Sequence, residues 1–73
     1  MSEGPPVWLD LRGLPPPEPL VLALEAASSL HAGCELVVVT EQRPVHLLPQ
    51  LLQRGLNFHT SPRPDGYETR IHW

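Results

Sequence analysis

Residues 9–19 read LDLRGLPPPEP, and this proline-rich stretch limits most strongly how the chain can fold. Just before and into it, the segment VWLDL alternates, with a valine and two leucines on one face, which predicts a half-buried strand over residues 7–11. A proline has no N–H to donate to a sheet, so the strand must end at the turn that Gly13 permits. Because proline is tolerated in the first turn of a helix, we expect a helix to begin near Pro17 or Glu18.

This first helix has an apolar stripe at helical spacing, formed by Leu20, Leu24, Ala27 and Leu30 or His31. Gly33 stands where a C-terminal cap is expected. The run ELVVVT at residues 35–40 is almost continuously apolar and β-branched, which is typical of a central strand buried on both faces.

A second helix is predicted over residues 45–54 and ends at Gly55. Its expected buried side consists of Leu47, Leu48, Leu51 and Leu52. Pro49 must lie in the first turn of this helix, because further along it would remove a hydrogen bond and kink the helix.

The last segments predict a β-hairpin whose register follows from alternation, since apolar residues must share one face. A four-residue loop over 63–66, with a Pro-Asp-Gly sequence that suits a type I turn, achieves this. The resulting pairs are Phe58 with Ile71, Leu56 with Trp73, Pro62 with Tyr67, His59 with Arg70 and His72 with Asn57.

The element order is therefore βαβαββ. Right-handed crossovers place both helices on the same face of the sheet. We predict an α/β (α+β) two-layer sandwich with a four-stranded mixed sheet and two helices on one face. The 73 residues suffice for a single domain over 1–73, in which residues 1–6 form a flexible tail.

Composition excludes several classes of function. The net charge is −3, and the five basic residues are all arginines scattered along the chain, which argues against nucleic-acid binding. No apolar run reaches the roughly 18 residues of a membrane helix, and the N-terminus lacks the features of a signal peptide. Cys34 is the only cysteine, so no internal disulfide can form. We expect a cytoplasmic protein, and the arginine-rich, lysine-free composition suggests a GC-rich bacterium.

The stretch LDLRGLPPPEP resembles the start of the TusA-like (SirA-like) sulfur-carrier family, which has a similar strand, an Arg-Gly turn and Cys-Pro-x-Pro where the first helix begins. The matching positions are Arg12, Gly13, Pro17, Glu18 and Pro19, and the likeness extends over nearly the whole chain. The chain is even more similar to a sister group of small bacterial domains of unknown function. That group shares the pattern Glu-x-x-Pro-Val-x-Leu-Leu-Pro, which residues 41–49 fit.

The family's catalytic cysteine falls on Pro16. Sulfur carriage needs a thiolate, whose pKa the positive end of a helix lowers, and proline supplies no nucleophile. Cys34 begins the second strand, so it lies at the opposite end of the parallel strands. A structural thiol is the simpler interpretation of Cys34, and an atypical sulfur carrier or redox protein acting through Cys34 is the alternative.

Two surfaces are candidates for binding. The first is the carboxyl end of the two parallel strands, where open α/β sheets bind ligands and where an anion would suit the helix N-termini. Its candidate residues are Arg12, Gly13, Pro16, Pro17, Glu18, Pro19, Glu41 and Arg43, beside Asp10. A plain rim of loop charges, with Arg12 paired to a carboxylate, is the alternative.

The second surface is the sheet face opposite the helices, formed by Trp8, His59, Arg70 and His72. It predicts a protein partner or a weak homodimer, unless long side chains cover it. His59 and His72 are diagonal neighbours that could share a metal ion, but no third ligand completes a site, so we predict no metal.

No nucleophile stands beside a base in a recognisable motif, and no glycine-rich phosphate loop is present. The sequence therefore predicts neither enzymatic activity nor a cofactor. It favours a non-catalytic binding or accessory domain whose partner is another protein. The alternatives are sulfur carriage through Cys34 and a small metal- or anion-binding protein.

Overall fold

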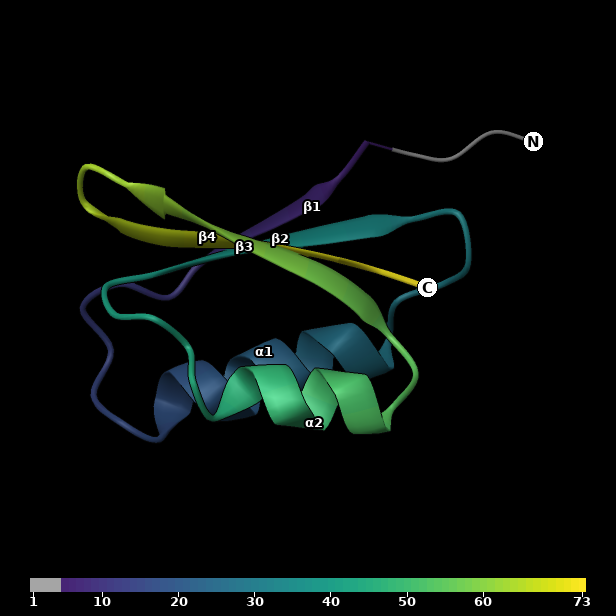
Figure 1. Cartoon of the computed structure of the whole chain (residues 1–73), viewed down its shortest axis with the longest axis horizontal. Coiled ribbons are helices and arrows are strands. Elements are labelled where there is room, and N and C mark those ends of the chain that lie inside the picture. Colours follow the sequence, from purple (N-terminus) through teal and green to yellow (C-terminus); the bar gives the residue numbers. More distant parts are fainter. Residues whose placement is uncertain (1–4) are drawn as a thin grey trace.

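The structure is a computed structural model that describes residues 5–73, and it has the predicted βαβαββ order (Figure 1). The first four residues of the expected tail lie outside the described residues, and the next two, both prolines, are exposed. The elements are β1 (Val7–Asp10), α1 (Glu18–Ser28), β2 (Glu35–Thr40), α2 (Leu47–Gln53), β3 (Asn57–Arg63) and β4 (Gly66–His72).

The four strands form one sheet in the order β1-β2-β4-β3, with β1 and β2 parallel and the other neighbours antiparallel. Both helices lie below the sheet in Figure 1, so the other face has no helix on it. The predicted two-layer α/β sandwich is confirmed. Strand β2 is central, and its three valines, Val37, Val38 and Val39, are all buried, as the apolar run predicted.

The hairpin register is the predicted one. Phe58 pairs with Ile71 and Pro62 pairs with Tyr67. The loop is shorter than expected, because Arg63 and Gly66 also pair and leave only two residues in the turn. Each strand thus extends one residue further into the predicted loop, without any change of register.

Helix α1 begins at Glu18 as predicted but ends at Ser28, well before Gly33. The N–H groups of Ser29 and Leu30 donate to the carbonyls three residues earlier, at 3.2 and 3.1 Å, and this tighter turn closes the helix. Gly33 has a φ of 86° and lies in the turn before β2, so the expected cap is wrong. The buried line of the helix is formed by Ala23 and Ala27.

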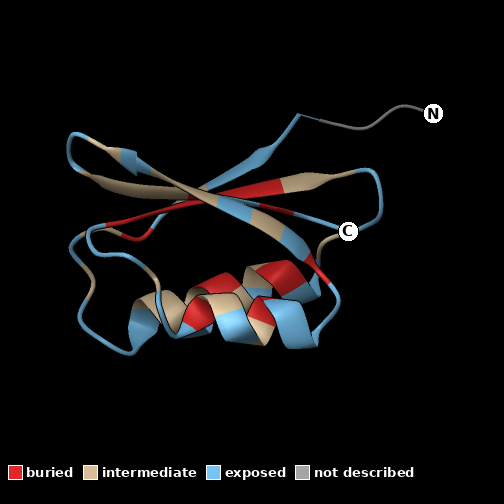
Figure 2. Ribbon diagram, viewed as in Figure 1, coloured by how far each residue is buried: buried red, intermediate tan, exposed pale blue. Residues whose placement is uncertain are grey.

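Helix α2 is shorter than predicted, since it starts at Leu47, and Pro49 lies in its first turn as required. Leu47 and Leu51 are buried, but Leu52 is 69% exposed, so its expected place in the core is wrong. Figure 2 shows that the helices bury only the side turned to the sheet. None of the helices in residues 5–73 is long and apolar enough to cross a bilayer.

Candidate functional site

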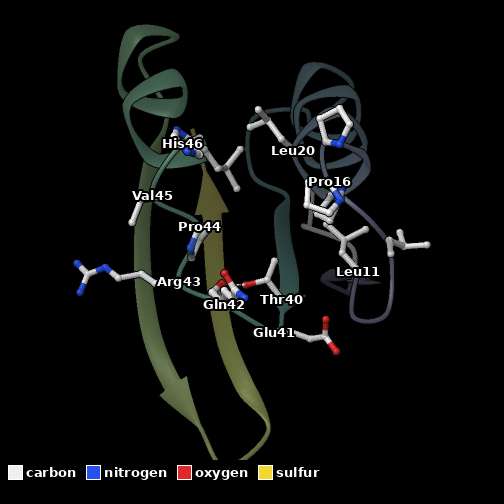
Figure 3. Close-up of a pocket in the computed structure, with 14 residues that line it drawn as sticks. Leu11, Pro16, Leu20, Thr40, Glu41, Gln42, Arg43, Pro44, Val45 and His46 are labelled. Atoms are coloured by element: carbon white, nitrogen blue, oxygen red, sulfur yellow. Dashed lines mark hydrogen bonds between the residues drawn. The ribbon is translucent and has the colours of Figure 1, made fainter.

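A pocket of about 380 Å³ opens at the carboxyl ends of β1 and β2, where the chain enters α1 and α2 (Figure 3). One wall is formed by the segment between β1 and α1 and by the first turn of α1. Its residues are Leu11, Leu14, Pro16, Pro17, Pro19 and Leu20. The other wall comes from the end of β2 and the segment leading into α2, through residues 40–47. This is the first of the two surfaces that the sequence indicated.

The walls of the pocket offer few hydrogen-bond donors. Four of the lining residues are prolines and have no N–H. The N–H of Glu18 already donates to the carbonyl of Pro15 at 3.0 Å, and the N–H of Leu47 donates to that of Pro44 at 3.1 Å. An anion bound where helices begin needs free N–H groups, so this pocket suits an apolar group better than an anion.

Two hydrogen bonds fix the floor of the pocket. The N–H of Leu11 donates to the carbonyl of Val39 at 2.8 Å, which holds the segment after β1 against β2. The hydroxyl of Thr40 donates to the carbonyl of Gln42 at 2.7 Å and shapes the loop after β2 (Figure 3). The two loops are therefore positioned by the central strand rather than by each other.

The sequence grouped Arg12 with Glu41 and Arg43, but of these three residues only Glu41 and Arg43 line the pocket. The guanidinium of Arg12 binds Asp10 at 2.8 and 2.9 Å and also pairs with Asp65 at the hairpin turn. Arg12, Gly13 and Glu18 are not among the residues that line the pocket. For Arg12 the structure thus has the alternative arrangement, an ion pair with a nearby carboxylate.

The Arg12 pair changes the titration of Asp10. Hydrogen bonds from the side chain and the N–H of Arg12 lower the pKa of Asp10 from 3.8 to about 2. The same carboxylate raises the pKa of Arg12 above its ordinary value. Both groups lie at the surface, so the interaction is screened by salt.

We expect Arg12→Gln to return the pKa of Asp10 toward 3.8, as measured by NMR titration of the carboxyl carbon. Because the folded pKa is the lower one, the pair stabilises the protein above the unfolded pKa of 3.8, and this contribution disappears as the pH falls through about 2. The stability difference between wild type and Arg12→Gln should therefore shrink toward pH 2. An unchanged Asp10 titration in Arg12→Gln would contradict this assignment.

The second predicted surface, the sheet face opposite the helices, is covered by paired side chains. Arg70 binds Glu35 at 3.3 Å and Glu68 at 3.0 Å. Its guanidinium also lies over the Trp8 ring, 6.0 Å from the centroid. The pairs continue toward the hairpin turn through Arg63, which approaches Glu68 and Asp65.

These long side chains lie over the two valines of that face. Val37 is in register with Trp8 and Arg70, and Val39 with Asp10 and Glu68. Both valines are almost completely buried although no helix lies on their side of the sheet. Trp8 itself is 54% exposed.

The histidines are where the register predicted. His59 pairs with Arg70 and His72 with Asn57, and both imidazoles are on exposed residues of the open face. Within residues 5–73, no group of three or more His, Cys, Asp or Glu side chains is arranged to hold a metal ion. His46 lies apart from them and lines the pocket.

Cys34 is half-buried and directly precedes β2, and its N–H donates to the carbonyl of His31 at 3.0 Å. The loop between α1 and β2 lies at the end of the sheet opposite the pocket (Figure 1). The thiol is therefore remote from Pro16, which lines the pocket.

Sequence reasoning missed the apolar members of the site, chiefly Leu11, Leu14, Leu20 and Val45. It named the three prolines at 16, 17 and 19, which do line the pocket, but otherwise mainly charged groups at the strand ends. A usable signal was present, because leucines on both sides of the Arg12-Gly13 turn must face the protein or a ligand. Proline-rich segments before both helices also indicated walls without N–H donors.

The fold and this pocket define a small two-layer α/β domain with an apolar pocket where both helices begin. The chain belongs to a family described as uncharacterized conserved proteins, DUF2249, which it matches over residues 8–72. No curated protein and no solved structure matches the chain.

Proposed function

We propose that this protein is a non-catalytic binding domain of TusA-like architecture, and that its pocket receives an apolar side chain of a partner protein. The observation that carries the proposal is the pocket of about 380 Å³, with largely apolar walls, at the carboxyl ends of β1 and β2. Such a site binds through burial of apolar surface, at roughly 25 cal/mol for each Å² removed from water.

Pro16, two residues before α1, supports a binding role over sulfur transfer. Pro16 stands where the sulfur carriers have their cysteine, and its ring adds apolar wall to the pocket. Cys34 directly precedes β2, and the loop between α1 and β2 lies at the end of the sheet opposite the starts of both helices (Figure 1).

The state of the open sheet face also favours the pocket as the binding surface. Its charged side chains neutralise one another and already bury Val37 and Val39. A partner or a second copy bound there would meet the half-exposed Trp8, but it would have to displace these pairs to reach Val37 and Val39. The pocket needs no such rearrangement.

Photo-crosslinking tests the proposal. A benzophenone side chain at position 45 should form a covalent adduct with one defined protein in the native cells, because Val45 lines the pocket and is 57% exposed. The same group at position 52 serves as the control, since Leu52 is also exposed but does not line the pocket.

The captured protein must then bind the purified domain. We expect Val45→Asp to weaken that complex about tenfold, the effect of losing one buried apolar contact, and Leu52→Asp to leave it unchanged. Equal adducts at both positions would contradict the pocket as the binding site. Transfer of sulfur from a cysteine desulfurase to Cys34, lost in Cys34→Ser, would contradict a non-catalytic role.

A further inference from the structure

Two opposite charges flank the pocket and have no ion-pair partner in residues 5–73. They belong to Glu41 and Arg43, which lie two residues apart in the loop after β2, and both residues are exposed. Figure 3 shows the two side chains pointing to opposite sides, with the loop between them. The hydrogen bond from Thr40 to the carbonyl of Gln42 fixes the backbone on which both stand.

The other arginines are all engaged. Arg12, Arg63 and Arg70 form ion pairs, and Arg54 donates to the hydroxyl of Ser28 at 3.0 Å. Among the arginines of this chain, all of which the structure describes, only Arg43 has a guanidinium without a partner in residues 5–73. The other four arginines thus each have an intramolecular partner for the guanidinium, and Arg43, which lines the pocket, differs from them.

The shape of an extended peptide matches this arrangement. In an extended chain, side chains two residues apart point to the same side, at a rise of about 3.3 Å per residue. A central apolar side chain in the pocket would thus carry a neighbour on each side, two positions away, toward the rim. One neighbour would meet Arg43 and the other would meet Glu41.

We propose that the pocket recognises an extended segment of the partner protein in which an apolar residue lies between a basic and an acidic residue, each two positions away. This inference rests on the proposed function and specifies the partner's chemistry. The charges give selectivity, and burial of the apolar side chain gives most of the affinity. A free anion fits less well, because the carboxylate of Glu41 shares the rim and the walls have few free N–H groups.

Synthetic peptides with blocked ends test the proposal, with Lys-Ser-Leu-Ser-Glu as the probe. Titration into the isotope-labelled protein should shift the amide resonances of residues 40–47, which line the pocket. Replacing the leucine of the peptide by alanine should weaken binding about tenfold, because less apolar surface is buried.

Charge variants then test the two rim contacts. Arg43→Gln should weaken binding of the probe about threefold, but it should not change binding of a peptide in which the glutamate is replaced by Gln. Likewise, Glu41→Gln should weaken binding of the probe about threefold, but it should not change binding of a peptide in which the lysine is replaced by Gln. Arg54→Gln is the matched control and should have no effect, since Arg54 is a surface arginine outside the pocket.

Two results would overturn this inference. One is equal affinity of the wild type for the charged peptide and for peptides with either charge neutralised. The other is the absence of any shift in residues 40–47 at millimolar peptide. Neither result bears on the adduct expected at position 45, so the proposed function is judged separately.

Discussion

The Gly66→Ala substitution is expected to destabilise the protein by about 3 kcal/mol or more, as measured by urea denaturation. A Cβ atom at Gly66 would lie 2.1 Å from the carbonyl oxygen of Thr40 and 3.1 Å from its carbon. Both are backbone atoms of the central strand, so no side-chain rotation relieves the clash. The total stability of a domain this size is roughly 4–11 kcal/mol, so much of it would be lost.

The damage should also reach the pocket. Thr40 lines the pocket and pairs with Tyr67, next to the glycine. We therefore expect the amide resonances of residues 40–47 to shift in any Gly66→Ala protein that remains folded.

Gly55→Ala is the matched control for this substitution. Gly55 has a φ of +79°, but a Cβ there would have no heavy atom within 4 Å. Only the strain of the left-handed conformation remains, which costs about 1 kcal/mol. Equal destabilisation by the two substitutions would show that the close approach of β4 to the end of β2 is not what requires glycine at position 66.

The second large effect is expected from Leu51→Ala. Leu51 is fully buried and belongs to the core between α2 and the sheet, with Leu36 and Ile71. Removing its side chain leaves a cavity that the packed neighbours fill only in part, so we expect a loss of about 3 kcal/mol in the free energy of unfolding.

The adjacent leucine provides the comparison. Leu52→Ala should change the free energy of unfolding by no more than about 0.5 kcal/mol, because its side chain is mostly in water. Similar losses from the two substitutions, measured under the same conditions, would contradict the orientation of α2 described above.

These two leucines also show where sequence reasoning fails. Periodicity located the second helix and identified a leucine-rich side, but a seven-residue helix with leucine at four positions fits several rotations about its axis. Contact with the sheet selects the rotation that buries Leu47 and Leu51. Local pattern alone does not contain that contact.

The candidate site, too, was predicted only in part from the sequence. The sequence located the end of the sheet where both helices begin, because parallel strands place their carboxyl ends together. It grouped Arg12 with Arg43, because both follow strands that end at this edge. Only the folded hairpin brings Asp65 to Arg12, so that the guanidinium is engaged in ion pairs and does not line the pocket.

The sequence by itself determined the element order, the hairpin register and the lack of a nucleophile at Pro16. Each of these depends on neighbours in the chain: alternation fixes strand pairing, prolines fix where helices begin, and side-chain chemistry is local. The tertiary structure decided the strand order, the rotation of α2 and the partners of the charges. Those depend on distances between segments far apart in the chain, such as the 53 residues that separate Arg12 from Asp65.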